Sequence, residues 1–314
     1  MTFHRENILS RSKMPQEQLD KYYEMYRKAR YEAGKGPGNV IFRKMIHPIL
    51  LFLIILQRIM KKEKIILLRN DEVSTKRPVI YACTHIGGHD VERCFEAIKK
   101  HAFLFIGDPK EVYRNFDGVL LFANGMICLE TRSKEDRYIA KMNAIELLNK
   151  NGKLLIYPEG VWNISENLLV NPMYMGTASI AMKTNADIVP VAIEQYDKTF
   201  YVSIGQNIEC GIWNSTEVEL LTKHIRDELA TLKWEIFEAR GIQSYESITK
   251  ELRNNWINAI FARADYSYTV QDVYDTQYIT DEQKEMMEIY SDLSHLIPSI
   301  DNAFLFRELI QKKL

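Results

Sequence analysis

The strongest constraint in the sequence is an alternation, between residues 77 and 209, of short apolar runs with polar segments of helical length. The apolar runs are "RPVIYACT" (77–84), "AFLFIGD" (102–108), "GMICLE" (125–130), "KLLIYPE" (153–159), "DIVPVAIEQY" (187–196) and "TFYVSIGQNI" (199–208). Apolar strands that alternate with helices are typical of a sheet buried on both faces. The pattern therefore predicts an α/β fold, with a largely parallel or mixed sheet flanked by helices.

Helices are predicted on both sides of this alternation. Residues 15–33 combine good helix formers with a partly apolar face, and residues 218–236 repeat apolar side chains at helical spacing. Residues 242–314 are polar and helical, and they contain no chemical motif. The sequence thus divides into an N-terminal helical, membrane-associating segment (1–70), an α/β domain (71–241) and a helical C-terminal extension packed on the same domain (242–314).

An apolar run at 49–56 lies among basic residues, namely Arg43, Lys44, Arg58, Lys61, Lys62 and Lys64. A helix that crosses a bilayer needs about 20 apolar residues, so this run is too short to cross alone. Two alternatives fit it: a buried core helix, or an interfacial helix whose basic residues meet the lipid headgroups. We predict the interfacial helix, because lysines and arginines flank the run on both sides.

Charge, cysteine use and the N-terminus limit the partners and the location. Forty-one Lys and Arg against 42 Asp and Glu leave a formal net charge of -1, so there is no global attraction to nucleic acid. The four cysteines form no C-x-x-C pair, which suits a reducing compartment. The first residues lack the apolar core of a signal peptide. We therefore predict a cytoplasmic protein that associates peripherally with the inner face of the membrane.

The run "HIGGHD", residues 85–90, follows the first predicted strand. Its two glycines allow the chain to turn, so that Asp90 can return to His85. A histidine oriented by a carboxylate is the arrangement of a general base near neutral pH. Two alternatives stay open: Asp90 caps the next helix, or His85, His89 and Asp90 bind a metal ion. A zinc site would need distant ligands, and no second histidine or cysteine cluster occurs in the sequence.

Further polar blocks accompany the other predicted strands. "CLETRS" ends one strand with Arg132, whose planar guanidinium suits a bidentate contact with phosphate or carboxylate. "YPEGVWN" (157–163) ends another strand. "IVPV" places Pro190 inside a strand, which is unusual unless that strand is an edge or bends there. Because function gathers at the carboxyl ends of parallel strands, these blocks are expected near His85.

In this order, "HIGGHD", "GMICLETR", "YPEGVWN" and "IVPV" resemble the signatures of the glycerolipid acyltransferase family. That family includes the glycerol-3-phosphate and 1-acylglycerol-3-phosphate acyltransferases and related lysophospholipid acyltransferases. The resemblance covers about residues 77–210. It implies that His85 is the general base, that Asp90 orients it, and that Arg132 binds the acceptor together with Glu159 and Gly160. No cofactor, metal ion or covalent acyl-enzyme is implied.

The third block departs from the family pattern. Where the family has E-G-T-R-S, this chain has "EGVWN", so Trp162 replaces an arginine and Asn163 replaces a serine. Arginine would bind an acceptor phosphate, whereas tryptophan offers stacking and one N–H donor. Trp162 is therefore a candidate substrate-binding residue for an acceptor without phosphate. The alternatives are that Arg132 holds the phosphate with a nearby lysine, or that Trp162 only packs under a loop.

The resemblance predicts transfer of a fatty acyl group from an acyl thioester, acyl-CoA or acyl carrier protein, to a hydroxyl of a glycerolipid. The expected acceptor is a lysolipid or glycerol-phosphate-like molecule, such as 1-acylglycerol-3-phosphate in phospholipid biosynthesis, met at a membrane surface. An unphosphorylated or other amphiphilic acceptor is an alternative. Two other classes of function also fit the residues: a metal-dependent hydrolase, and a non-catalytic membrane-binding relative.

Overall fold

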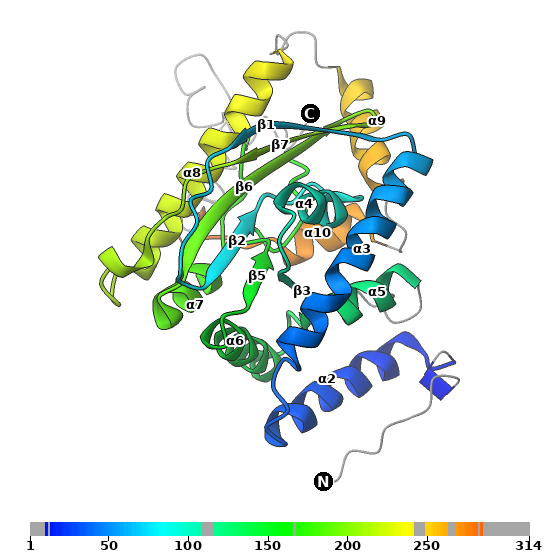
Figure 1. Cartoon of the computed structure of the whole chain (residues 1–314). Helices are drawn as coiled ribbons and strands as arrows, with labels where there is room; N and C mark the ends of the chain where they lie inside the picture. The colour runs from blue at the N-terminus through cyan, green and yellow to red at the C-terminus, as the bar shows by residue number, and fades with distance from the viewer. Residues whose placement is uncertain are drawn as a thin grey trace, which may run out of the picture.

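The central feature of the molecule is a sheet of seven strands in the order β1-β7-β6-β2-β5-β3-β4 (Figure 1). The computed structural model describes residues 10–11, 13–107, 116–165, 168–241, 249–262, 268–281 and 283–284. The strands are β1 (Lys64–Asn70), β2 (Val79–Cys83), β3 (Phe103–Gly107), β4 (Met126–Leu129), β5 (Lys153–Ile156), β6 (Asp187–Tyr196) and β7 (Thr199–Ile204). Neighbouring strands are parallel except β6 and β7, which are antiparallel. The predicted α/β fold with a mostly parallel sheet is confirmed.

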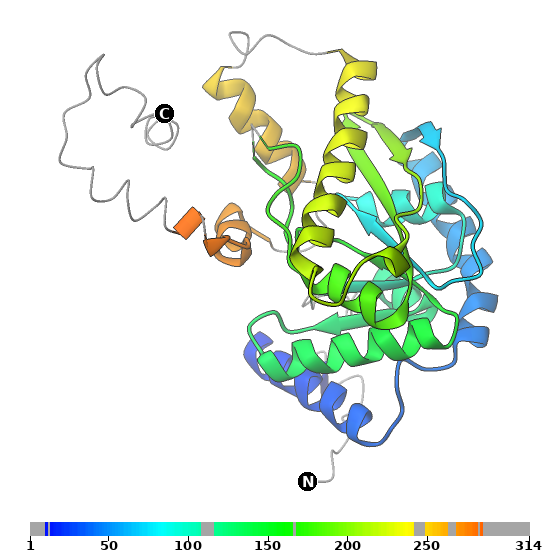
Figure 2. The same ribbon diagram turned by 90° about the vertical axis from the view of Figure 1, so that its left-hand side faces the viewer.

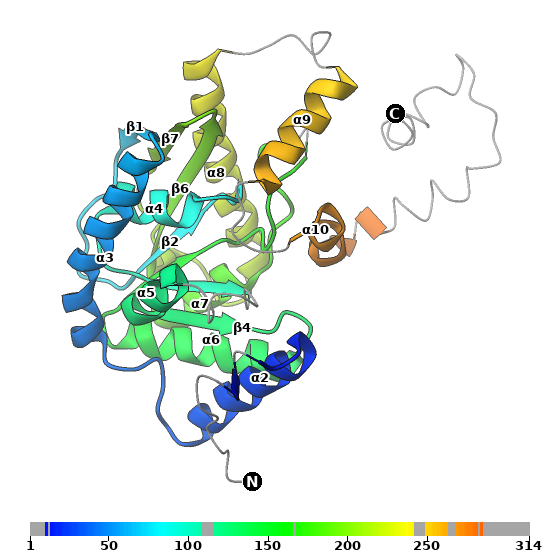
Figure 3. The same cartoon turned by 90° about the vertical axis from the view of Figure 1, so that its right-hand side faces the viewer.

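Helices cover both faces of this sheet. They are α2 (Gln16–Glu32), α3 (Val40–Met60), α4 (Asp90–Ile98), α5 (Phe116–Asn124), α6 (Lys134–Asn149), α7 (Gly176–Thr184), α8 (Val218–Arg240), α9 (Lys250–Phe261) and α10 (Val270–Thr276), with a 3-10 turn η1 (Cys210–Ile212). Helices α6, α7 and α8 pack on one face, and α3, α4 and α5 lie over the other (Figure 3). Helix α2 lies against α6, where Arg27 Nη2 is 2.8 Å from Asp136 Oδ2 (Figure 2).

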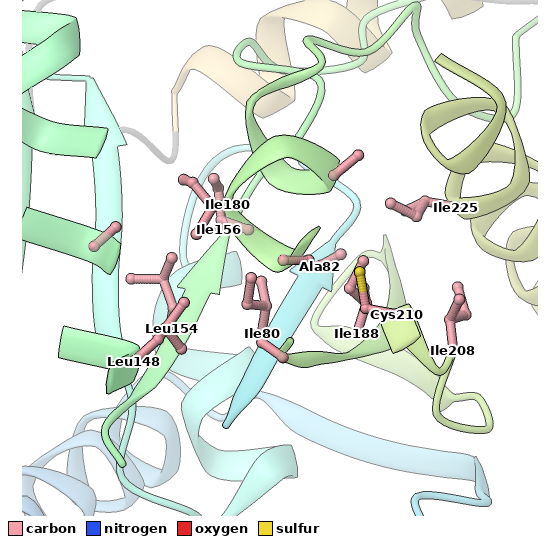
Figure 4. Packing of buried hydrophobic residues seen from close by; sticks show 14 of the residues in the cluster. Ile80, Ala82, Leu148, Leu154, Ile156, Ile180, Ile188, Ile208, Cys210 and Ile225 are labelled. Carbon is pink, nitrogen blue, oxygen red and sulfur yellow. The ribbon is translucent and has the colours of Figure 1, made fainter. Parts of the chain in front are cut away.

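Successive strand residues supply the two cores in turn. On β2, Ile80 and Ala82 face the core under α6, α7 and α8, together with Leu154 of β5 (Figure 4). Their neighbours Val79 and Tyr81 face the core under α3 and α4. This alternation is the period of two expected of a strand, and both faces are buried because helices cover both. It explains why the strands appear in the sequence as continuous apolar runs.

Strand β1 was not predicted from the sequence. It lies at the sheet edge and pairs in parallel with β7, with Lys64 opposite Thr199. Its run Ile66, Leu67 and Leu68 is 38%, 42% and 39% exposed, so it shows neither the alternation nor the full burial that marks the other strands. Because β7 runs antiparallel to β6, β1 also runs opposite to β2 and β5. The first residues of β1 therefore lie near the carboxyl ends of β2 and β5.

Pro190 lies in an interior strand and not at an edge. Strand β6 pairs with β2 on one side, where Pro190 is opposite Ala82, and with β7 on the other. The ladder with β7 begins only at Val191, and on that side the Pro190 carbonyl accepts the Gly205 N–H at 3.0 Å. The missing proline N–H therefore falls where the neighbouring strand has ended.

Helix α3 extends well beyond the apolar run at 49–56. It has 21 residues, about 32 Å at 1.5 Å per residue, and within the described chain it is the helix long and apolar enough to cross a membrane by length and composition. The prediction that this segment is too short to cross is therefore wrong for the helix as a whole. It nevertheless contacts the domain at both ends: His47 Nδ1 is 2.8 Å from Asn124 Oδ1, and Arg58 Nε is 2.8 Å from Glu96 Oε1.

The described part of the C-terminal extension packs on the block that begins with Tyr157. Ile260 of α9 and Val273 of α10 bury apolar surface against Trp162 and its neighbours Val161 and Ile164. The Tyr174 hydroxyl donates a hydrogen bond to the Thr276 carbonyl at 2.9 Å. The remaining residues of the predicted extension 242–314 lie outside the described residues.

Candidate active site

Three of the predicted site residues follow strands that end at one edge of the sheet. His85 follows β2, Glu159 follows β5 and Arg132 follows β4, and these strands run parallel. Strands β2 and β5 are direct neighbours, so His85 and Glu159 come together. Strand β4 is three positions from β2, which places Arg132 about 14 Å along the edge at 4.8 Å per strand.

His85 and Asp90 form a hydrogen-bonded pair. His85 Nδ1 lies 2.8 Å from Asp90 Oδ2, and the two side chains are 11% and 1% exposed. A carboxylate only accepts, so Nδ1 carries the ring proton and Nε2 keeps its lone pair. Within the described chain Nε2 has no hydrogen-bond partner, and it is not a buried atom, so solvent reaches it. The ring is thus set as a proton acceptor.

Asp90 also shapes the turn that brings it back to His85. Its Oδ2 accepts the N–H groups of Ile86 at 2.8 Å and Gly87 at 2.9 Å. The turn requires φ of +81° at Gly87 and +63° at Gly88, values that L side chains seldom adopt. Asp90 is also the first residue of α4, so the same carboxylate organises the helix start and meets the histidine.

Two aromatic rings contact the His85 ring, one stacked on its face and one edge-on to it. The Tyr157 ring stacks on the His85 ring at 4.1 Å between centroids and 24° between planes. Trp162 is 3% exposed and stands edge-on to His85, with centroids 6.2 Å apart. It also lies so close to Gly87 that a Cβ there would be 2.7 Å from the indole. Sequence reasoning assigned no role to Tyr157, although it lies within the third block.

Glu159 is fully buried between two loops. Its Oε1 accepts the His85 N–H at 3.0 Å, and its Oε2 accepts the Asn171 N–H at 2.8 Å. Burial raises the pKa of Glu159 to about 7. The two N–H donors and the charge of Lys233 favour the ionised form and lower the pKa, but burial has the larger effect. The carboxylate therefore supports the backbone of His85 from behind.

Gly160 and Arg132 lie at more exposed positions. Gly160 has φ of +73°, and a Cβ there would be 2.6 Å from the Tyr174 ring. The Arg132 side chain is exposed, and its backbone N–H donates to Glu130 Oε1 at 3.2 Å. Of the predicted acceptor residues, these two are solvent-facing, whereas Glu159 and Trp162 are buried.

The Acyltransferase family model matches residues 64–194, a range that includes His85, Arg132 and Glu159. This match identifies the chain as an acyltransferase. It is 25% identical over 185 residues to the 1-acyl-sn-glycerol-3-phosphate acyltransferase of Borreliella burgdorferi, covering 53% of this chain and 70% of that protein. The His85–Asp90 pair fits the H-x4-D signature, and the chain is a glycerolipid acyltransferase.

The fold of this acyltransferase resembles a solved structure. The crystal structure of the 1-acyl-sn-glycerophosphate (LPA) acyltransferase PlsC from Thermotoga maritima aligns with a TM-score of 0.50 at 16% identity. The alignment covers 73% of this chain and 100% of the other chain. At this identity the likeness concerns the fold.

The acyltransferase contains a second histidine–carboxylate pair, which the sequence did not predict. His89 Nδ1 lies 2.9 Å from Glu63 Oε1, and its Nε2 lies 2.6 Å from Lys61 Nζ. Glu63 comes just before β1, so only the pairing of that unpredicted strand reveals the contact. Over the described residues, no group of three or more His, Cys, Asp or Glu side chains is placed to hold a metal ion. His89 therefore faces Glu63 and Lys61 and does not form a ligand set with His85.

Proposed function

We propose that this acyltransferase moves a fatty acyl group from an acyl thioester to the free hydroxyl of a lysophospholipid, with 1-acylglycerol-3-phosphate as the acceptor. The observation that carries the proposal is the His85–Asp90 pair, whose Nε2 is unpartnered among the described residues at the end of β2. The acceptor is suggested by the Borreliella burgdorferi relative, a 1-acyl-sn-glycerol-3-phosphate acyltransferase. Acyl-CoA and acyl carrier protein are both suitable thioester donors.

In this mechanism His85 acts as a general base. Nε2 removes the proton from the acceptor hydroxyl as its oxygen attacks the thioester carbonyl. Asp90 keeps the proton on Nδ1 and stabilises the imidazolium that forms. When the tetrahedral intermediate collapses, the C–S bond breaks and the thiolate leaves, taking the proton from His85. An ester and a free thiol are the products, and no metal or acyl-enzyme takes part.

We assign the acceptor phosphate to Arg132. Its guanidinium is exposed at the same sheet edge and suits bidentate contact with phosphate. Trp162 packs against Gly87 and the C-terminal helices, and this favours the packing alternative over direct stacking on the acceptor. Gly160 is exposed next to Glu159, and we propose that its backbone contacts the acceptor.

Helix α3 supports a reaction at a membrane surface. One side of α3 carries large apolar residues that are 42% to 71% exposed and spaced three or four apart: Phe42, Met45, Ile49, Phe52, Leu56 and Ile59. Such a stripe beside basic residues suits an interfacial helix. Since the opposite side of α3 packs on the domain, we propose that α3 lies in the headgroup region of the inner membrane face, and that the domain is cytoplasmic.

The proposal is tested by incubating the purified protein with acyl-CoA and a panel of phosphorylated and unphosphorylated acceptors, with products identified by mass spectrometry. We expect acylation of 1-acylglycerol-3-phosphate and release of free CoA. His85→Ala should lower the rate by about 10²- to 10⁴-fold while the thermal unfolding midpoint stays near that of the wild type. If the wild type consumes no thioester with any acceptor, the chain is a non-catalytic relative. If only unphosphorylated acceptors react, the Arg132 assignment fails.

A further inference from the structure

A cluster of buried ionisable residues lies behind the loop that carries His85 and Asp90. Its members are His89, Glu63 and Arg93, which are 6%, 8% and 0% exposed. They come from three elements: the turn between α3 and β1, the end of the His85 loop, and α4. The mechanism described above uses none of them.

Within the cluster each oxygen of Glu63 has its own partner. Oε1 is 2.9 Å from His89 Nδ1, and Oε2 is 3.0 Å from Arg93 Nε and 2.9 Å from Arg93 Nη2. On the far side of the imidazole, Lys61 Nζ lies 2.6 Å from Nε2. A lysine ammonium can only donate, so Nε2 accepts and Nδ1 donates to Glu63. The contacts thus define one tautomer of a neutral His89.

The cluster joins helix α3 to helix α4. Arg93 Nη1 donates to the Ile54 carbonyl, and Arg93 Nη2 donates to Gln57 Oε1, both at 3.3 Å. Glu63 then connects this guanidinium to His89, which is the N-cap residue of α4. The next residue in the chain is Asp90.

Buried ion pairs are a weak source of stability, because removing the charges from water offsets most of their attraction. Their directional bonds do fix geometry. The loop from His85 to Asp90 contains two glycines in positive-φ conformations, so its own backbone is easily deformed. At the α4 end of the loop, the His89 side chain supplies an external support through its contact with Glu63.

We propose that His89 is a positioning residue for acyl transfer: its Nδ1 bond to Glu63 fixes the end of the loop and so the place from which Asp90 holds His85. This inference rests on the proposed roles of His85 and Asp90. A misplacement of about 1 Å at reacting groups can lower a rate about 100-fold, so loss of the bond should appear in kcat. The contacts of the His89 side chain are to Glu63 and Lys61, and not to the proposed acceptor residues, so KM should change little.

Three substitutions separate the two bonds of the imidazole. His89→Asn places an amide N–H near the position of Nδ1 and keeps the donor to Glu63. His89→Gln reaches the position of Nε2, where its oxygen can accept from Lys61, but it loses the Glu63 bond. His89→Ala loses both. We expect the Ala and Gln variants to lower kcat by about 10- to 100-fold, with KM for acyl-CoA within about twofold, and the Asn variant to stay within about threefold of wild type.

His47→Ala is the matched control. His47 is also buried, lies on α3, and has Nδ1 2.8 Å from Asn124 Oδ1, but it does not contact the His85 loop. It should lower the unfolding midpoint as His89→Ala does, while kcat per folded molecule remains that of the wild type. Folded fractions are measured by near-ultraviolet circular dichroism.

The outcomes are distinct. If all three His89 variants keep the wild-type kcat per folded molecule, the cluster only joins α3 to α4 and the inference is wrong. It is equally wrong if the Asn variant loses as much activity as the Ala variant. Should the Ala variant not fold, the contrast between Asn and Gln decides. A wild-type protein that consumes no thioester would instead overturn the proposed function.

Discussion

The described part of the chain contains two histidine–carboxylate pairs that differ mainly at the second ring nitrogen. His85 Nδ1 lies 2.8 Å from Asp90 Oδ2, and His89 Nδ1 lies 2.9 Å from Glu63 Oε1. The two imidazole side chains are similarly buried, at 11% and 7% exposure. Nε2 of His89 is bound to Lys61, whereas Nε2 of His85 has no partner in the described part of the chain. Availability of the second nitrogen, and not the contact distance, marks the candidate base.

The two carboxylates differ as well. Glu63 is paired with the guanidinium of Arg93, so its charge is already compensated. Among the described residues Asp90 has only His85 as an ion-pair partner, and its other contacts are backbone N–H groups. An uncompensated carboxylate stabilises a neighbouring imidazolium more strongly. The first pair is therefore suited to accept a proton, and the second to hold a fixed geometry.

The largest effect expected from this contrast is that of Asp90→Asn. The amide oxygen can replace Oδ2 as acceptor, but the negative charge that stabilises the imidazolium is lost. We expect kcat to fall by about 10²- to 10⁴-fold. The equivalent change in the second pair, Glu63→Gln, should lower kcat per folded molecule only about tenfold. Both values come from the same thioester-release assay, and equal losses would remove the distinction between the pairs.

The sequence predicted those parts of the fold that depend on local composition. Strands buried on both faces, such as β2 and β6, appear as apolar runs. Strand β1 has an exposed edge, and its apolar residues follow a lysine-rich turn, so no period distinguished it. Pro190 suggested a strand that is an edge or bends there, but its place depends on where β7 ends, which is a property of the neighbouring strand.

The candidate site divides in the same way. His85 and Asp90 lie in one short loop, so their spacing and the glycines between them allowed the pair, and the family resemblance then favoured it over a helix cap or a metal site. Glu63 is 26 positions from His89 in sequence, and its contact depends on β1. Glu159 was expected at the acceptor from family resemblance. Its position between two backbone N–H groups could not be predicted, because it depends on how the loops around Asn171 fold back.

A third carboxylate extends the comparison, because Glu159 accepts the backbone N–H of His85, and among the described residues no carboxylate does the same for His89. Burial raises the pKa of Glu159 to about 7 from 4.5. Between about pH 4.5 and pH 7, Glu159 therefore keeps a proton in the folded protein but releases it in the unfolded chain. This contribution to stability is fully present below about pH 4.5 and is lost as pH rises through about 7, a total of about 3 kcal/mol.

Glu159→Gln cannot titrate, so it tests this contribution. We measure the unfolding free energy of both proteins in urea at pH 4.5 and at pH 8. Relative to Glu159→Gln, the wild type should lose about 3 kcal/mol of stability between these two pH values. Burial also lowers the pKa of His47 and His101, but both variants contain these groups and their contribution cancels. Parallel pH curves would show that Glu159 is ionised throughout.

The smallest effect is expected for Lys61→Met, which frees Nε2 of His89 without changing the Glu63 bond. Lys61 is exposed, so its loss should change the free energy of unfolding by no more than about 0.5 kcal/mol. We expect kcat to stay within about twofold of wild type, because the Nδ1 contact to Glu63 remains. The double variant His85→Ala with Lys61→Met should be as inactive as His85→Ala, because the proposed base is His85 and not His89. Recovery of turnover in that double variant would mean that either histidine can serve as the base, and the two pairs would then differ only in whether Nε2 is occupied.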